Sequence, residues 1–171
     1  MRDVANFIAP SGMHFARRCA IGYQAPCLCP SPALHQTESD INMPLVTLTV
    51  QKPKSAEVKT FVLDSIHEAL ISAGVPVTDR FQRVIELSAE DIRFDASYPD
   101  LSKPRDENFM IIEILWSVGR SVRVKRTLLV DLMSRLGKHG IVSEQVMVCF
   151  KETAWENWSF AGGRLLHADG N

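Results

Sequence analysis

Apolar and polar residues alternate along the chain with two different periods from residue 44 onward. In residues 44–50 and 80–87 apolar or β-branched residues alternate with polar ones, which predicts two β-strands. Residues 109–116 are apolar at nearly every position, which predicts a strand at the centre of a sheet. A shorter run over 145–151 predicts a fourth strand.

Two stretches between these strands have the period of an α-helix, with apolar residues recurring every three or four positions. A serine that can act as N-cap precedes each stretch, and a glycine follows it. The first predicted helix lies between Ser55 and Gly74, and the second between Ser121 and Gly140. Residues 88–108 are rich in Asp, Ser, Pro and Lys and are predicted to form a long surface loop.

The second half of this pattern repeats the first after a shift of 66 positions. The matching pairs include Val46 and Ile112, Ser55 and Ser121, Lys59 and Lys125, Leu70 and Leu136, Gly74 and Gly140, and Glu86 and Glu152. The repeated unit is therefore β-α-β, a crossover between parallel strands. Two units predict an α+β fold with a four-stranded sheet, two helices on one face, and an uncovered face that oligomerisation would bury.

Residues 1–43 differ from the rest of the chain. Pro26, Pro30 and Pro32 crowd one segment, and no helical or strand period persists. We interpret this part as a disordered extension, or as sequence upstream of a translation start at Met43. The predicted domain is 44–171.

Composition narrows the classes of function. The formal net charge of −1 gives no indication of binding to nucleic acid or to an anionic membrane. The cysteines, at positions 19, 27, 29 and 149, form neither a disulfide framework nor a zinc spacing, so the reducing cytoplasm is the default compartment. No apolar run approaches the length of a membrane span, and no nucleotide loop or metal motif is present, so no cofactor is implied.

The pair Met43-Pro44 opens the first predicted strand. If translation began at Met43 and this residue were removed, the nitrogen of Pro44 would become a secondary amine. An α-amino group has an ordinary pKa of about 7.7–8.0, so it can exchange protons near neutral pH, which an amide nitrogen cannot. The alternative is that Pro44 is an internal residue opening an edge strand.

Four stretches in order along this scaffold resemble the tautomerase superfamily, and most closely its malonate semialdehyde decarboxylase-like group, over residues 44 to about 165. They are Pro44-Leu45, the segment from Gly74 to Gln82, Gly119-Arg120-Ser121, and Trp158-Ser159-Phe160 with Gly163-Arg164. The chain departs from the decarboxylase pattern at Val118, where that group has a second arginine, and at Ala161, where it has glycine.

The resemblance implies a cofactor-independent enzyme that assembles as a homotrimer and acts on small oxo acids. Pro44 would be the acid or base, Asp79 would activate water or hold a carbonyl, and Arg120 would bind the substrate carboxylate. Arg80 is a second candidate for substrate binding, and Trp158 and Phe160 would line the pocket.

Each of these residues also has a purely structural interpretation. Asp79 could cap a turn, Arg120 could be a surface residue, and Arg80 could pair with Glu86 or Asp79 at a strand edge. His67 and His139 occupy helix positions that are expected to lie at the surface or at its boundary with the core, and neither has an evident catalytic partner. The competing functional hypothesis is a catalytically silent homo-oligomer that binds a ligand while Pro44 stays internal.

Overall fold

The computed structural model describes residues 43–165 of the chain. Its strands and helices are β1 (Leu45–Gln51), α1 (Ala56–Ser72), β2 (Phe81–Leu87), β3 (Met110–Ser117), α2 (Val122–Gly137), the 3-10 turn η1 (Ser143–Gln145), β4 (Val146–Thr153) and the 3-10 turn η2 (Trp155–Asn157). All four strands and both helices expected from the sequence are confirmed, with ends that differ by one or two residues. None of the described helices is long and apolar enough to cross a membrane.

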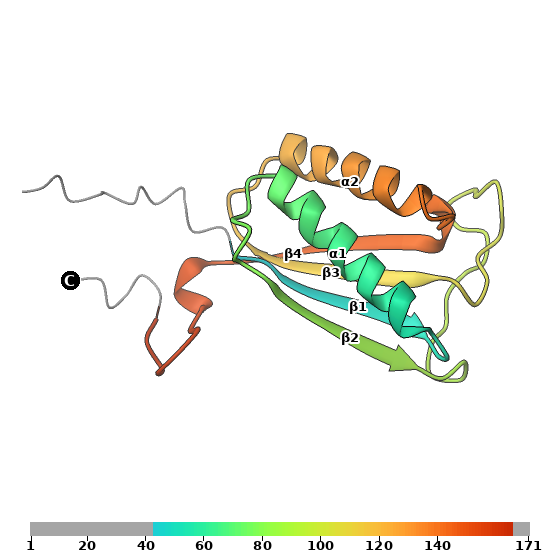
Figure 1. The fold of residues 1–171 in the computed structure, drawn as a ribbon, viewed down its shortest axis with the longest axis horizontal. Helices are drawn as coiled ribbons and strands as arrows, with labels where there is room; N and C mark the ends of the chain where they lie inside the picture. Colours follow the sequence, from blue (N-terminus) through green and yellow to red (C-terminus); the bar gives the residue numbers. More distant parts are fainter. Residues whose placement is uncertain (1–42, 166–171) are drawn as a thin grey trace, which may run out of the picture. The chain divides into compact units, whose positions relative to one another are not determined.

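The four strands form one sheet in the order β2-β1-β3-β4 (Figure 1). β1 is parallel to β2, β3 is parallel to β4, and the two pairs meet through antiparallel pairing of β1 with β3. Each parallel pair is joined by one helix, and both helices cover the same face of the sheet (Figure 1). The predicted duplicated β-α-β fold is thereby confirmed.

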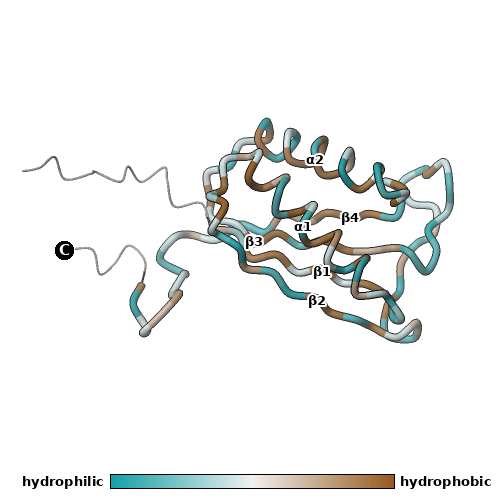
Figure 2. The backbone as a smooth tube through the Cα atoms, viewed as in Figure 1, coloured by the Kyte–Doolittle hydropathy of each residue, from teal (hydrophilic) through white to brown (hydrophobic). Residues whose placement is uncertain are grey.

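The core lies between this face and the two helices. Side chains on β1 and β3 alternate between the faces, so every second residue points to the helices and is buried. These residues pack against one stripe of each helix, and Figure 2 shows the apolar positions following the central strands and the inner turns of the helices. The fully buried members include Val46, Leu48, Ile112 and Ile114 of the sheet, Ile66 and Leu70 of α1, and Leu128, Leu132 and Leu136 of α2. Burying one such aliphatic side chain contributes about 1.5–3 kcal/mol, so this layer is the main source of stability.

The two halves repeat one another in their hydrogen bonds as well as in their sequence. The Ser55 and Ser121 hydroxyls accept from the N–H groups of Val58 and Val124, at 3.2 and 3.3 Å. The glycines that follow the helices, Gly74 and Gly140, both have positive φ, at 97° and 77°. This conformation costs other residues energy, which explains why glycine stands at both helix ends.

The ion pairs of the two units also correspond. Lys59 pairs with Glu86 at 2.9 Å, and Lys125 pairs with Glu152 at 2.7 Å. Each pair joins the first turns of a helix to the strand that follows it. The shift of 66 positions thus reflects a duplicated three-dimensional unit.

The second face of the sheet carries no helix among the described residues. Phe81, Ile85 and Met147 on this face are 45%, 39% and 46% exposed. Ion-paired Lys151 and Glu113 lie among them. A sheet face of this mixed character is typical of a surface covered by another subunit.

We expect removal of residues 1–43 to leave the fold intact, because the described core lies entirely within residues 46–136. Thermal unfolding of the full chain and of the 44–171 form should give midpoints within about 3 °C of each other. A fall of ten degrees or more after the deletion would show that the first 43 residues belong to the folded domain.

Candidate functional site

The beginnings of β1 and β2 meet the ends of β3 and β4 at one end of the sheet. Leu45 pairs with Phe81 on one side and with Leu115 on the other. Continuing this register by one residue places Pro44 between Arg80 and Trp116. The topology therefore brings Pro44, Asp79 and Arg120 to one end of the sheet, although they come from three separate segments.

Trp116 lies at the centre of this end. It is fully buried, and it faces the helices, as buried Pro44 does. The guanidinium carbon of Arg120 lies 5.3 Å from the centre of the Trp116 ring. Trp116 thus adjoins both the proline and the arginine, and its ring gives Arg120 a cation–π contact.

The position of Arg120 follows from the chain turn after β3. Gly119 has a φ of 104°, which turns the backbone, and Ser121 then caps α2. Burial lowers the pKa of Arg120, and the nearby Glu152 carboxylate opposes this effect. A guanidinium keeps its charge under these conditions, and its planar shape suits a carboxylate held by two hydrogen bonds.

Asp79 lies in the turn that precedes β2. Its N–H donates to the Pro76 carbonyl at 3.0 Å, and its side chain is half-buried. Burial raises the pKa of Asp79 to about 6, and the positive charge of His67 opposes this rise. The Asp79 carboxyl therefore changes its protonation close to neutral pH, as a proton-transferring group should.

Arg80 points toward helix α1. It forms an ion pair with Asp64, and its Nε donates to Gln82 Oε1 at 2.9 Å. The structural alternative considered for Arg80, an ion pair with Glu86 or Asp79, named the wrong partner: Arg80 pairs with Asp64, and Glu86 is held by Lys59. Substrate binding by Arg80 stays a prediction.

The segment after β4 crosses this end of the sheet. Trp158 and Phe160 stack with their ring centres 5.3 Å apart, and Phe160 lies 5.6 Å from Phe81. Since Phe81 belongs to the edge strand opposite β4, the tail must span the sheet to reach it. Trp158 and Phe160 thus lie at the end where they were predicted, and their contact with a substrate stays a prediction.

Three buried polar atoms at this end have no hydrogen-bond partner among the described residues: Asp79 Oδ1, Ser117 Oγ and Trp158 Nε1. The part of the chain that the structure describes has one further such atom, Arg105 Nε, in the loop before β3. Buried polar atoms are nearly always paired, so a cluster of unpaired ones indicates a place where polar ligand atoms can bind.

The opposite end of the sheet provides an internal comparison. There the repeat places Lys54 where Arg120 stands, Met110 where Pro44 stands, and Gln145 where Asp79 stands. These residues help to line a cavity of about 310 Å³. The side-chain amide of Gln145 makes its hydrogen bonds with the loop before β3: it accepts from the Asp106 N–H at 3.1 Å and donates to the Pro104 carbonyl at 3.2 Å. The position that Asp79 occupies at one end is therefore taken at the other end by a neutral side chain whose hydrogen bonds are made within the chain.

Two residues of the site were missed from the sequence. His67 was expected at a surface or boundary position, but it is only 6% exposed, and its charge opposes the rise in the pKa of Asp79. Trp116 was treated as part of an apolar strand. Comparison of the repeats would have singled out both, because their counterparts are Met133 and Val50.

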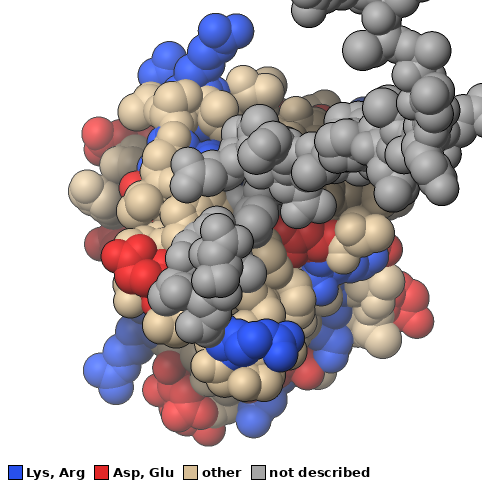
Figure 3. Space-filling model, turned by 90° about the vertical axis from the view of Figure 1, so that its left-hand side faces the viewer, with Lys and Arg blue, Asp and Glu red and all other residues tan. Residues whose placement is uncertain are grey.

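Figure 3 looks onto the end of the sheet that carries the candidate site. Basic and acidic side chains are interspersed over its visible part, with no field of a single sign. Among residues 43–165, no group of three or more His, Cys, Asp or Glu side chains could hold a metal ion.

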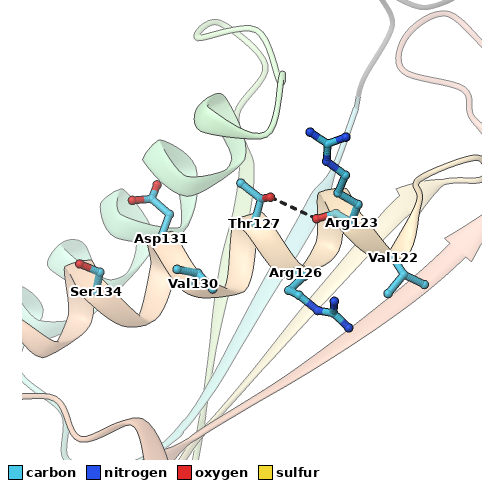
Figure 4. A pocket seen from close by; sticks show the side chains of 7 residues that line it. All are labelled: Val122, Arg123, Arg126, Thr127, Val130, Asp131 and Ser134. Atoms are coloured by element: carbon cyan, nitrogen blue, oxygen red, sulfur yellow. Dashed lines mark hydrogen bonds between the residues drawn. The ribbon is translucent and has the colours of Figure 1, made fainter.

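A different hollow, of about 700 Å³, lies along α2 (Figure 4). Its lining residues all come from this helix: Val122, Arg123, Arg126, Thr127, Val130, Asp131 and Ser134. The Thr127 hydroxyl donates to the Arg123 carbonyl at 3.1 Å. None of the site residues predicted from the sequence lines this hollow.

Comparison with known proteins agrees with this fold. Residues 79–161 match the sequence model of a family described as Tautomerase enzyme. A structure of malonate semialdehyde decarboxylase, reported in wild-type, mutant and inactivated forms, is 25% identical with a TM-score of 0.65, covering 71% of this chain and 93% of that chain. The FG41 malonate semialdehyde decarboxylase inhibited by 3-bromopropiolate is 24% identical with a TM-score of 0.64, covering 71% of this chain and 92% of that one.

A third structure, a symmetric trimer of wild-type fused 4-OT, is 18% identical with a TM-score of 0.58 and covers 74% of this chain and 99% of that chain. No curated protein sequence matches the chain. The fold and the family match together support a place for this protein in the tautomerase superfamily. Within that superfamily it is similar to the malonate semialdehyde decarboxylase group.

Proposed function

We propose that this protein is a cofactor-independent enzyme acting on small oxo acids, with Pro44 as an amino-terminal proton carrier. The observation that carries the proposal is the gathering of Pro44, Asp79 and Arg120 at one end of the sheet, where the opposite end has Met110, Gln145 and Lys54. The relative at 25% identity supports the assignment of Pro44, because one of its reported forms replaces a proline at its first residue.

Each group has a distinct task in this proposal. The Arg120 guanidinium binds the substrate carboxylate, and the start of α2 adds positive potential beside it. The Trp158 indole N–H is a donor suited to a carbonyl oxygen, and the rings of Trp158 and Phe160 exclude water. Asp79 exchanges a proton with the carbonyl oxygen or with a water molecule.

The protonation state of Pro44 selects between two reactions. A neutral amine removes a proton from the carbon next to the carbonyl and returns it to another atom, which is keto–enol tautomerisation. A protonated amine can donate to the carbonyl oxygen of a 3-oxo acid while the bond to the carboxylate breaks, its electrons form the enol, and carbon dioxide leaves. Arg120 favours the neutral amine, whereas the Asp79 carboxylate favours the protonated one.

The test begins with the intact mass of the protein isolated from its source. A mass corresponding to a chain that begins at Pro44 is expected. That form should convert at least one member of a panel of small 2-oxo and 3-oxo acids, followed by proton NMR. A native chain that retains residues 1–43 and converts no member of the panel would instead support a silent ligand-binding protein.

We also expect a homotrimer in solution. The open sheet face carries exposed Phe81, Ile85 and Met147, and a fused 4-OT of the same fold forms a trimer. Light scattering at micromolar concentration should give three times the mass of the chain. A monomer under these conditions would contradict the prediction.

A further inference from the structure

We propose that His67 is the positioning residue of Asp79: its imidazole ties the turn that carries Asp79 to α1, and its positive charge keeps the Asp79 carboxylate available for proton transfer. This inference rests on the proposed function only for its catalytic consequence. The contact between His67 and the turn that carries Asp79 is independent of the proposed function.

The first observation is the burial and bonding of His67. It is 6% exposed, and its Nε2 lies 3.0 Å from the Val77 carbonyl oxygen, two residues before Asp79. A carbonyl only accepts, so Nε2 carries the proton in this contact. The Nε2–H of the imidazole thus holds the turn that carries Asp79 against α1.

The second observation is the comparison between the two units. Asp79 and Gln145 occupy the same structural position, because their N–H groups donate to Pro76 and Val142 with the same length of 3.0 Å. The residue that corresponds to His67 on α2 is Met133, which packs against the core. Thus one unit combines two titratable side chains, and its duplicate combines two neutral ones.

This paired difference has a physical explanation. A carboxyl group in a half-buried turn is destabilised in its charged form, and a nearby cation compensates for part of that cost. Gln145 carries no charge and obtains hydrogen bonds from the loop before β3, so a cation beside it would serve no purpose. Methionine there simply fills apolar space.

The other charged groups around this corner do not replace His67. Arg80, the next residue along the chain, is paired with Asp64 of α1, and the side chains of both are about half exposed. At the other side of the sheet end, Arg120 has Glu152 beside it. Burial raises the pKa of Asp79 to about 6, and His67 is the charged group that counteracts this rise.

The experiment is a titration of the Asp79 carboxyl carbon by NMR in the full 171-residue chain with carbon-13-labelled aspartate. The signal is assigned with Asp79→Asn. In the unmodified protein the midpoint should lie near pH 6. His67→Gln keeps an N–H that can reach Val77 but cannot carry charge, and His67→Met installs the residue of the other unit. Both should raise the midpoint by at least about half a pH unit, a threefold change in the ionisation constant.

His139→Gln is the matched control, because His139 stacks on Phe61 with ring centres 3.7 Å apart and does not act on Asp79. It should leave the midpoint unchanged. An unchanged midpoint in a folded His67→Gln protein would overturn the proposal. If His67→Met fails to fold, His67→Gln alone decides.

Activity separates this inference from the proposed function. For the form beginning at Pro44, the pH profile of kcat/KM falls on its acidic side. In His67→Gln this fall should shift to higher pH together with the NMR midpoint. If the NMR midpoint moves while the acidic limb stays in place, the coupling holds and the catalytic role of Asp79 is refuted. If neither moves, the role of His67 is refuted and that of Asp79 is untouched.

Discussion

A single glycine placed before Pro44 should abolish turnover of a small oxo acid by the 44–171 form. The extension converts the secondary amine of Pro44 into an amide, which has no proton to exchange near neutral pH. It changes no described contact of β1, whose first paired residue is Leu45. Loss of turnover by at least about a thousandfold, with an unchanged melting temperature, is therefore expected from the loss of general acid–base catalysis. The measurement is kcat on the best substrate of the panel.

Pro44→Ala supplies the graded control for this prediction. Alanine leaves a primary amine at the same position, so activity should fall without vanishing, and the pH profile should shift with the different pKa of the amine. If the full 171-residue chain, shown by mass to be unprocessed, is as active as the 44–171 form, proton transfer through Pro44 is excluded. Asp79 would then be the leading candidate for the base.

Periodicity and duplication determine most of this fold, and both can be seen in the sequence. The N-cap serines, the helix-ending glycines and the Lys–Glu pairs recur after 66 positions and make the same contacts in both units. The central place of β3 followed from apolar residues at nearly every position. The caps, helix ends and strands are local or strictly periodic, which is why a single sequence was enough to predict them. The two Lys–Glu ion pairs were not predicted, because Glu86 had been considered as a partner of Arg80.

The contacts of the site depend on where distant segments of the chain meet. Neither the residue periodicity nor the internal repeat indicates those meeting points. Nothing in the alternation of β2 indicated that Arg80 would turn to Asp64 and away from Asp79. The tail has no period, so its crossing from β4 to Phe81 could not be derived. His67 falls at a boundary position of α1, and only the packed structure shows that the turn carrying Asp79 covers it.

The internal repeat shows which differences matter for function. Where the two units agree, the shared residues form helix N-caps, helix C-terminal ends and core contacts. At corresponding positions of the sheet ends, one end has Pro44, His67 and Asp79, and the other has Met110, Met133 and Gln145, whereas Arg120 and Lys54 are both cations. We expect these differences to mark the end of the sheet at which the proposed chemistry takes place.

Arg120→Ala should lower kcat/KM by about 30- to 5,000-fold, the equivalent of about 2–5 kcal/mol for a desolvated ion pair with the substrate carboxylate. If the ground state and the transition state are bound alike, most of this loss will appear as a raised KM. Arg120→Lys should recover only part of it, because an ammonium group cannot form the two parallel hydrogen bonds of a guanidinium. Lys54→Ala is the matched control: it removes a cation from the equivalent position at the opposite end, where Lys54 is held by Glu107 and Asn108. That variant should retain full activity. Equal losses in the Arg120 and Lys54 variants would mean that Arg120 acts through the charge or stability of the whole domain, and the assignment of the carboxylate site would have to be abandoned.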